Sequence, residues 1–237
     1  TVQAVLPISK GNTAKYVLLA TKKGIIKKTA IEKFKNVRQS GLAAIKLDSH
    51  DELIWAKLTS GNDQIFLTTH GGKCIRFNET DSRPMGRHTR GVRGINLKEN
   101  DYLVGIGIVP QSISAIKEEK TNKNFFRHLL VITENGIGKR SDVYLYPLQK
   151  RGGVGVKVAN LSEKSGNLAA TAVVTENDDQ VLFVSRKAVT IKLPLKNIPK
   201  LSRNTKGVIL MRLNADDRVC SMTVLPKKEI DATKTEK

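Results

Sequence analysis

The stretch QIFLTTHGGKCIRF, residues 64–77, decides the fold. It begins with a short apolar run, turns at two glycines and continues by alternating apolar with basic residues. Short runs rich in β-branched residues and bounded by turn residues are typical of two strands joined in a hairpin. The pattern returns as YVLLATKKGIIKKT at 16–29, HLLVITENGIGKRS at 128–141 and QVLFVSRKAVTIKL at 180–193. The chain is therefore built of four repeats.

Two further patterns follow the hairpins. The first is a glycine with apolar, polar and apolar residues four to six positions later, found as GLAAIKL from Gly41, GVRGINL from Gly91, GGVGVKV from Gly152 and GVILMRL from Gly207. The second starts ten residues after the glycine in three copies, at Asp51, Asp101 and Asp217, and four residues late in the third copy, GNLAATAVV from Gly166. Both patterns predict strands, the third and fourth of each repeat.

Repeats of four strands predict an all-β, β-propeller-like array of four-stranded blades, with four full repeats and one orphan N-terminal strand at residues 1–8. A row of separate small barrels fits less well, because one repeat alone buries too little apolar surface. We expect one domain over 1–226 and a flexible tail over 227–237, with 110–126 as a surface loop. The expected blades cover about 16–60, 64–110, 128–175 and 180–226.

The composition points to an acidic partner. Of 237 residues, 41 are Lys or Arg and 22 are Asp or Glu, which gives a net charge of +19. No apolar run is long enough to span a bilayer, so we expect no membrane contact. Two cysteines are too few for a disulfide framework or a Cys-based zinc site. Nucleic acid is the first candidate for a partner of so basic a chain.

A catalytic role has little support in the sequence. The four histidines, His50, His70, His88 and His128, stand at unrelated positions of the repeat and lack metal-ligand spacing. There is no nucleophile elbow and no phosphate-binding P-loop pattern. Cys74 and Cys220 alternate with apolar residues, which predicts buried small hydrophobes. We expect no catalytic residue, no metal and no cofactor in this chain.

The basic residues follow the repeat, and in radially arranged blades equivalent positions would share one rim. They could merely keep edge strands soluble, but Glu would serve equally well there, so the constant sign favours binding. The candidate DNA-binding residues lie in the second hairpin strand or close to the glycine of each repeat: Lys27, Lys28, Arg38, Arg76, Arg87, Arg90, Arg93, Lys139, Arg140, Gln149, Lys150, Arg151, Lys192, Arg203 and Lys206.

A curved basic track would suit the backbone of double-stranded DNA. Bending a short duplex costs a few kcal/mol, and repeated phosphate contacts can offset that cost. Aromatic residues make up only 5% of the chain, which disfavours single-strand binding by base stacking. No segment has the period of a recognition helix, so base-specific readout is not expected.

From residue 1 to about 226, the repeats resemble the C-terminal DNA-wrapping domains of DNA gyrase A, the β-pinwheels. The resemblance is strongest in DELIWAKLTSGNDQIFLTTHGGKCIRF, RPMGRHTRGVRGINL, ITENGIGKRSDVYLYP and SRNTKGVILMRL. It implies a disk of blades that exchange strands and wrap duplex DNA for negative supercoiling. It also implies, as partners, the rest of gyrase A together with gyrase B in an ATP-hydrolysing enzyme, in the cytoplasm of a bacterium or in an organelle of bacterial descent. The residues that cleave DNA would lie outside this chain.

One family motif is displaced. The gyrase box, Q-[RK]-R-G-G-[RK]-G, lies in the first blade of that family, whereas residues 149–155 here read QKRGGVG in the third repeat. Either these residues act as a box, or they are a relic and the box lies upstream. Two alternatives remain open for the whole chain: the equivalent domain of topoisomerase IV, or a basic propeller that binds an acidic protein.

Overall fold

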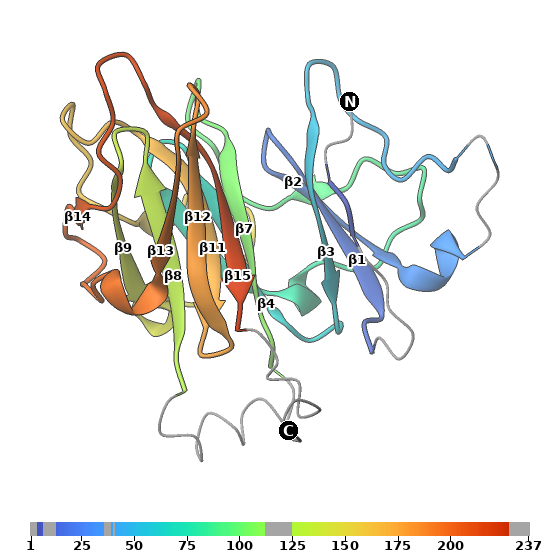
Figure 1. Ribbon diagram of the computed structural model, residues 1–237. Helices are drawn as coiled ribbons and strands as arrows, with labels where there is room; N and C mark the ends of the chain where they lie inside the picture. The colour runs from blue at the N-terminus through green and yellow to red at the C-terminus, as the bar shows by residue number, and fades with distance from the viewer. Residues whose placement is uncertain (1–3, 7–12, 36–38, 40, 112–124, 228–237) are drawn as a thin grey trace, which may run out of the picture.

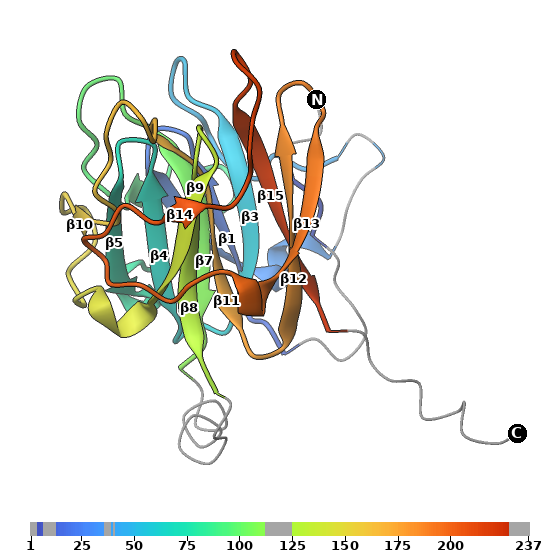
Figure 2. The same ribbon diagram turned by 60° about the vertical axis from the view of Figure 1, so that its left-hand side comes forward.

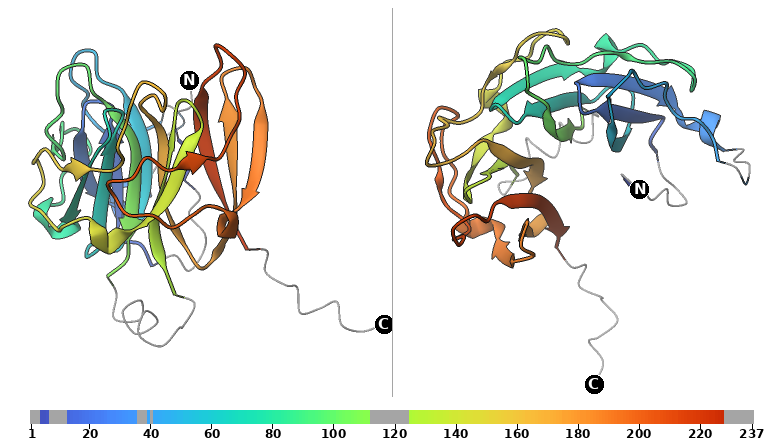
Figure 3. Two further views of the ribbon diagram at one scale, coloured as in Figure 1. Left: turned by 90° about the vertical axis from the view of Figure 1, so that its left-hand side faces the viewer. Right: turned by 90° about the horizontal axis from the view of Figure 1, so that it is seen from above.

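A computed structural model describes residues 4–6, 13–35, 39, 41–111 and 125–227. In this part of the chain, fifteen strands form four antiparallel sheets, joined by short 3₁₀ turns (Figure 1). The sheets stand side by side in an arc that is open between the first and the last, as the view from above in Figure 3 shows. The predicted all-β, propeller-like class is confirmed. No helix among the described residues is long and apolar enough to cross a membrane.

Every sheet has the same strand order from the inside of the arc outward. The innermost strands carry the Asp-led pattern or its late copy: β3 (Leu53–Thr59), β7 (Leu103–Val109), β11 (Leu168–Thr175) and β15 (Val219–Pro226). Next come the first hairpin strands, β1 (Tyr16–Thr21), β4 (Gln64–Thr69), β8 (Arg127–Thr133) and β12 (Asp178–Ser185). The second hairpin strands follow, β2 (Ile25–Ala30), β5 (Lys73–Asn78), β9 (Ile137–Asp142) and β13 (Thr190–Pro194).

The outermost strand of a sheet comes from the following repeat. β6 (Val92–Arg93) pairs with β2, β10 (Val156–Lys157) with β5, and β14 (Val208–Ile209) with β9. The glycine pattern therefore does not complete the sheet of its own repeat. It joins the sheet before it, as the strand exchange implied by the gyrase resemblance requires. β10 and β14 lie on the outer rim of the arc in Figure 2.

The two ends of the array lack this exchange. Residues 41–47 carry the first glycine pattern but form no strand, because the described residues contain no earlier sheet for them to join. The fourth sheet has three strands, β13-β12-β15. The predicted orphan strand is also missing where it can be tested, since residues 4–6 are not in a strand. The rest of that strand, and nearly all of the loop at 110–126 and the tail at 227–237, lie outside the described residues.

Three apolar clusters fill the spaces between neighbouring sheets. One packs Leu18 and Ile26 of the first sheet against Phe77 of the second. The other two join the second sheet to the third around Phe66 and Tyr146, and the third to the fourth around Phe183. Because each sheet is covered by its neighbour, burial is shared along the arc. This explains why β5, whose sheet has a neighbour on each side, is buried on both faces although its sequence alternates.

Short 3₁₀ turns carry the chain from each second strand toward the outer rim. They are η1 (Ile31–Phe34), η2 (Glu79–Asp81), η3 (Val143–Leu145) and η4 (Leu195–Asn197). After each of the last three turns the chain crosses to the preceding sheet. The crossing segments form the surface described next.

Candidate nucleic-acid interface

Three crossing segments of equal length, 83–97, 147–161 and 199–213, form the outer rim and are called here the rim segments. Parallel bridges fix their register: Lys28 pairs with Pro84, Arg76 with Leu148 and Arg140 with Lys200. Seven residues after each bridged position comes a glycine, followed at once by the outer strand. In the third repeat this glycine is Gly155. The sequence pattern aligned Gly152 with Gly91 and Gly207, and this alignment was wrong by three residues.

The backbone conformation at three positions of the rim segments requires glycine. Gly91, Gly155 and Gly207 have φ of +101°, +68° and +98°, in the left-handed region that favours glycine. A Cβ at each would stand 2.5–2.7 Å from a backbone oxygen of the preceding sheet. Any side chain there would push the outer strand away from the sheet that it completes.

Backbone hydrogen bonds join the rim segments into one belt. The N–H of Lys46, just before the first rim segment in the arc, donates to Thr89 O at 3.0 Å. Asn96 N–H then donates to Gly153 O at 2.8 Å, and Asn160 N–H to Thr205 O at 3.2 Å. The outer surface is therefore a continuous hydrogen-bonded belt and not a set of independent loops.

The belt has charge of only one sign. The rim segments hold four, three and four Lys or Arg, in chain order, and no Asp or Glu. Acidic neighbours touch the belt at its margin: Arg90 pairs with Asp48 at 3.1 Å, and Lys200 with Asp142 at 3.4 Å. The exposed cations, called here the rim cations, are Arg83, Arg90, Arg93, Lys150, Lys157, Lys200, Lys206 and Arg212. Sequence reasoning selected four of them and missed Arg83, Lys157, Lys200 and Arg212, which only the register of the rim segments brings onto this surface.

Other candidate cations bind the protein itself. Lys28 is 3% exposed and donates to Glu79 O at 3.1 Å, with its Nζ 3.5 Å from the Glu79 carboxylate. Arg76 is 8% exposed and donates to Tyr146 O at 3.0 Å, while half-buried Arg140 donates to Ile198 O at 2.8 Å. These three are called here the inter-repeat cations, since each reaches the turn of the next repeat. Their burial argues against the direct phosphate contact expected of them.

Lys27 and Lys139 are fully buried. Lys139 Nζ lies 2.7 Å from both Ser202 O and Arg203 O, and 2.9 Å from Thr205 O. Lys27 Nζ donates to Ala44 O at 2.5 Å and also to Arg87 O. Burial, with a nearby arginine as the smaller cause, lowers the pKa of each lysine to about 8. Neither ammonium group can meet a phosphate in this conformation.

Arg151 and Arg203, in the middle of their rim segments, use some of their N–H groups for hydrogen bonds within the protein. Arg151 donates from Nε to Asp81 O and from Nη1 to Arg93 O, both at 2.9 Å. Arg203 repeats this one sheet further on, reaching Leu145 O at 3.1 Å and Lys157 O at 2.6 Å. Arg87 stands at the same position of its rim segment and is half-buried. Arg151 and Arg203 thus join the belt to the preceding repeat and leave part of their charge at the surface.

The box-like stretch 149–155 is the middle of the second rim segment. Its two central glycines bring backbones together, with Gly152 N–H donating to Gly94 O at 2.6 Å. Gln149 is half-buried and Lys150 is exposed. Val154, the one departure from the family motif, is 59% exposed and stands where Arg90 and Lys206 stand in the neighbouring segments.

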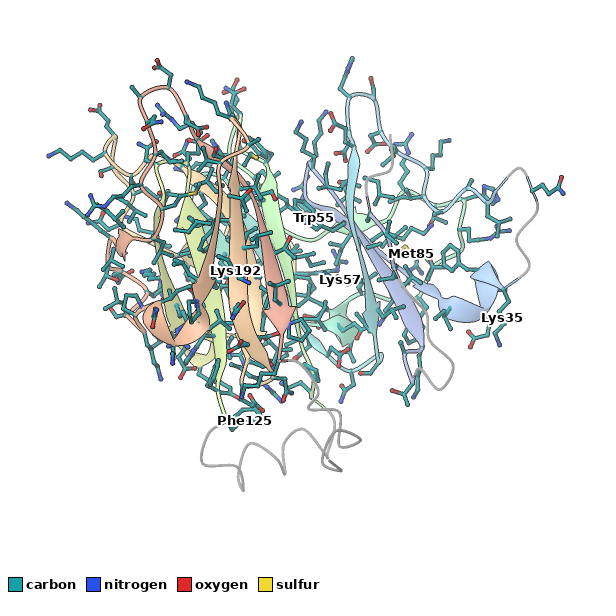
Figure 4. The ribbon with its side chains drawn as sticks, viewed as in Figure 1. Lys35, Trp55, Lys57, Met85, Phe125 and Lys192 are labelled. Atoms are coloured by element: carbon teal, nitrogen blue, oxygen red, sulfur yellow. The ribbon has the colours of Figure 1, made fainter. Side chains whose placement is uncertain are left out.

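The remaining candidates lie at the ends. Lys192 is exposed on β13, where the described part of the chain supplies no outer strand to cover it (Figure 4). Arg38 lies outside the described residues. The fifteen candidates thus separate into residues of the belt, a set buried between repeats, Lys192 on the uncovered β13, and Arg38, which cannot be placed.

The structure does not gather the histidines or cysteines into a site. No cluster of three or more His, Cys, Asp or Glu that could hold a metal occurs among the described residues. Burial, with Arg140 and Lys200 nearby, lowers the pKa of His128 to about 4. Burial raises the pKa of the Cys74 thiol to about 12. Cys74 is buried as expected, but the same expectation for Cys220 was wrong, because Cys220 is exposed on β15, an innermost strand.

Comparison with known proteins agrees with this architecture. A family described as "DNA gyrase C-terminal domain, beta-propeller" matches residues 15–60, 63–110, 127–175 and 179–226. The DNA gyrase A protein of Staphylococcus aureus (strain MRSA252) is 36% identical over 216 residues, which cover 91% of this chain and 23% of that protein. The chain therefore spans about a quarter of the length of this relative.

Solved structures give the same fold. The C-terminal domain of DNA topoisomerase IV aligns with a TM-score of 0.79 and 25% identity, over 93% of this chain and 65% of that one. A DNA gyrase A C-terminal domain aligns with a TM-score of 0.76 and 25% identity, over 90% and 67%. With its four matched repeats and its exchanged rim strands, the chain belongs to the DNA gyrase C-terminal domain family.

Proposed function

We propose that the outer belt binds the phosphate backbone of double-stranded DNA and bends the duplex around the arc. The observation that carries this proposal is the charge of the rim segments, which hold eleven Lys or Arg and no Asp or Glu. Eight of these cations are exposed on a convex surface that runs across the repeats. A duplex that follows such a surface must curve, and each further phosphate contact offsets part of the bending cost.

The belt contacts DNA through its shape and charge and not through base edges. It contains two-residue strands and turns but no helix that could enter a groove. Its exposed backbone and long flexible cations suit phosphate oxygens, which carry no sequence information. We therefore expect binding that depends weakly on sequence and strongly on salt.

Charge reversal on the belt tests the proposal. The variant Arg90→Glu, Arg93→Glu, Lys150→Glu and Lys206→Glu should lose at least about a hundredfold in affinity for a labelled duplex at low salt, because several phosphate contacts become repulsive. Its free energy of unfolding should change little, since all four side chains are exposed. The control is Lys57→Glu, on the innermost strand β3 and away from the belt (Figure 4). Unchanged DNA affinity in the belt variant would overturn the proposal.

Within a complete enzyme, we propose that this chain is the C-terminal part of a gyrase A protein, acting with gyrase B in negative supercoiling, in a bacterial cytoplasm or an organelle of bacterial descent. The 36% identity to a gyrase A protein supports this assignment. Grafting the chain onto a gyrase core that lacks its own C-terminal domain would test it. Negative supercoiling of relaxed plasmid is expected, and relaxation alone would contradict it.

The equivalent role in topoisomerase IV is the second candidate, favoured by the TM-score of 0.79 to that C-terminal domain. The plasmid assay separates the two, since wrapping by gyrase changes the sign of the linking-number difference. Binding of an acidic protein is a further outcome of the affinity experiment. It would be indicated if a labelled acidic peptide bound the chain and unlabelled duplex did not displace it.

A further inference from the structure

We propose that Lys27 and Lys139 are positioning residues that hold the first and third rim segments in their DNA-binding shape without touching DNA. This inference rests on the function proposed above and adds how the same surface is kept in place. It starts from the two lysines of the repeat whose side chains are fully buried and whose ammonium groups meet only oxygen atoms of the protein.

Lys139 closes the third rim segment from beneath. Its Nζ lies within hydrogen-bonding distance of three backbone oxygens, those of Ser202, Arg203 and Thr205, and 3.1 Å from Thr205 Oγ1. These oxygen atoms curl around one ammonium group, and Lys206, a rim cation, follows directly. Hydrogen bonds to a charged donor contribute more than those between neutral groups. Without Lys139, Arg203 O would lose its donor, while Ser202 O would keep those of Thr205 and Thr205 O would keep that of Asn160 N–H.

Lys27 does the same for the first rim segment. Its ammonium group binds Arg87 O, which is equivalent to Arg203 O in the third segment, and Ala44 O of the preceding glycine pattern. Arg90 and Arg93 follow on the same segment and are exposed. The two lysines thus bind the rim segments that carry Arg90, Arg93 and Lys206, three of the rim cations in the charge-reversal variant.

The second rim segment shows that the lysine is not simply part of the fold. Ile75 stands at the position of Lys27 and Lys139, so no ammonium group is available there. Its side chain would lie 3.5 Å from a Cβ at Gly153, and the backbones approach directly, with Gly152 N–H 2.6 Å from Gly94 O. The chain therefore uses two ways to fix a rim segment, a buried ammonium group in two cases and a pair of glycines in one.

The charges around the two lysines make the arrangement sensitive to proton loss. Arg87 faces Lys27 and Arg203 faces Lys139, both from the rim segment that the lysine binds. Among the described residues no carboxylate pairs with either ammonium group. A neutral amine still keeps two N–H donors for the four oxygen atoms around Lys139. Because burial lowers the pKa of this lysine below that of an exposed one, an opened rim segment binds the proton more tightly, so deprotonation should favour the closed segment.

A double-mutant cycle tests the inference by DNA affinity. Lys139→Met should weaken duplex binding about tenfold, and Lys206→Ala severalfold, but the two losses should not add, because Lys206 is already misplaced once Lys139 is gone. Lys150→Ala, on the glycine-held second segment, should cost the same in both backgrounds. Lys57→Met is the matched control, since it removes one lysine charge from the innermost strand β3. Additive losses for Lys139 and Lys206 would overturn the inference.

Hydrogen exchange tests the same point without DNA and without a substitution. In the wild-type chain, exchange at residues 200–207, corrected for its intrinsic pH dependence, should slow between pH 7 and pH 9, because the closed segment is favoured as Lys139 loses its proton, while 149–155 stays unchanged. Equal behaviour of both segments would overturn the inference even if Lys139→Met failed to fold. Hydrogen exchange reports on the rim segment without DNA, whereas charge reversal on the belt reports on DNA binding, so failure of either proposal can be distinguished from failure of the other.

Discussion

Two rows of basic side chains run along the arc. The inter-repeat cations Lys28, Arg76 and Arg140 lie between sheets and donate to backbone oxygens of the next repeat. The rim cations lie on the outer belt, exposed to solvent. The inter-repeat cations hold one equivalent position in each of three repeats, each rim segment carries two or three rim cations, and both rows use the same two residue types. Basic residues that recur with the repeat therefore mark equivalent positions in the sheets. Where another part of the chain covers such a position, the side chain stabilises the fold; where nothing covers it, the side chain is exposed to a partner.

Removing an inter-repeat cation should have the largest effect on stability. Lys28→Met leaves the carboxylate of Glu79, which is 0% exposed, without its cation. We expect the free energy of unfolding to fall by about 3–5 kcal/mol, the usual cost of breaking a buried pair from one side. Urea denaturation measures it. The added change Glu79→Gln should recover part of the loss, and a loss no larger than that of the exposed Lys57→Met would show that the two rows do not differ.

Raising the pH should separate folding from binding at Lys139. Its pKa is about 8 in the folded chain, and an unfolded lysine keeps its proton to about pH 10.4. Between these values the unfolded state binds more protons, so stability rises with pH in this window and the penalty is fully present below pH 8. The free energy of unfolding of wild type minus Lys139→Met should therefore rise by roughly 1–3 kcal/mol from pH 8 to 10.5.

DNA affinity should stay nearly constant from pH 7 to 9, because Lys139 does not touch DNA and its rim segment stays closed as the ammonium group loses a proton. Anisotropy titrations at constant salt would measure this. A stability difference that falls as pH rises would contradict the assigned burial of Lys139. Parallel changes of stability and affinity would show that binding merely follows folding.

Adding a rim cation should have the smallest effect. Val154→Arg places a basic residue where Arg90 and Lys206 stand, and completes the box pattern at 149–155. DNA affinity should rise a few-fold, and the slope of log affinity against log salt should steepen by roughly 0.9, as for one more phosphate contact. Stability should stay within about 0.5 kcal/mol because the position is 59% exposed. An unchanged salt slope would place this position off the DNA path.

Most of the fold could be predicted from the sequence because the hairpin has the same sequence pattern in every repeat. Alternation in β2 and β5 gave the strand periods, and four copies gave the blades. The partner of the glycine strand could not be read, since a two-residue strand such as Val92–Arg93 has the same pattern whichever sheet it joins. The sheet that this strand joins is determined by the length of the crossing segment and by the close approach of Gly91 to the backbone of Ile26, which only the structure shows.

The candidate site was predicted less completely. Sequence reasoning placed charge before each glycine, and Arg90, Lys150 and Lys206 do lie exposed on the belt. It assigned equal roles to Lys27 and Lys28, although both strand faces there are covered. Alternation assumes one solvent face per strand, and in stacked blades that face is filled by the next repeat. Burial from tertiary packing was the missing information.

Because each outer strand comes from the following repeat, the strand exchange also determines where the chain can be truncated. A truncation placed between the third and fourth repeats, near residue 178, would keep β8, β9 and β11 but delete β14, which completes their sheet. The shortened chain would expose the unpaired edge of β9 and uncover Lys139, so it would be prone to self-association through that edge. A cut near residue 213 would keep β14 but delete β15, the partner of β12, so fragments intended for expression should run through β15 to residue 226.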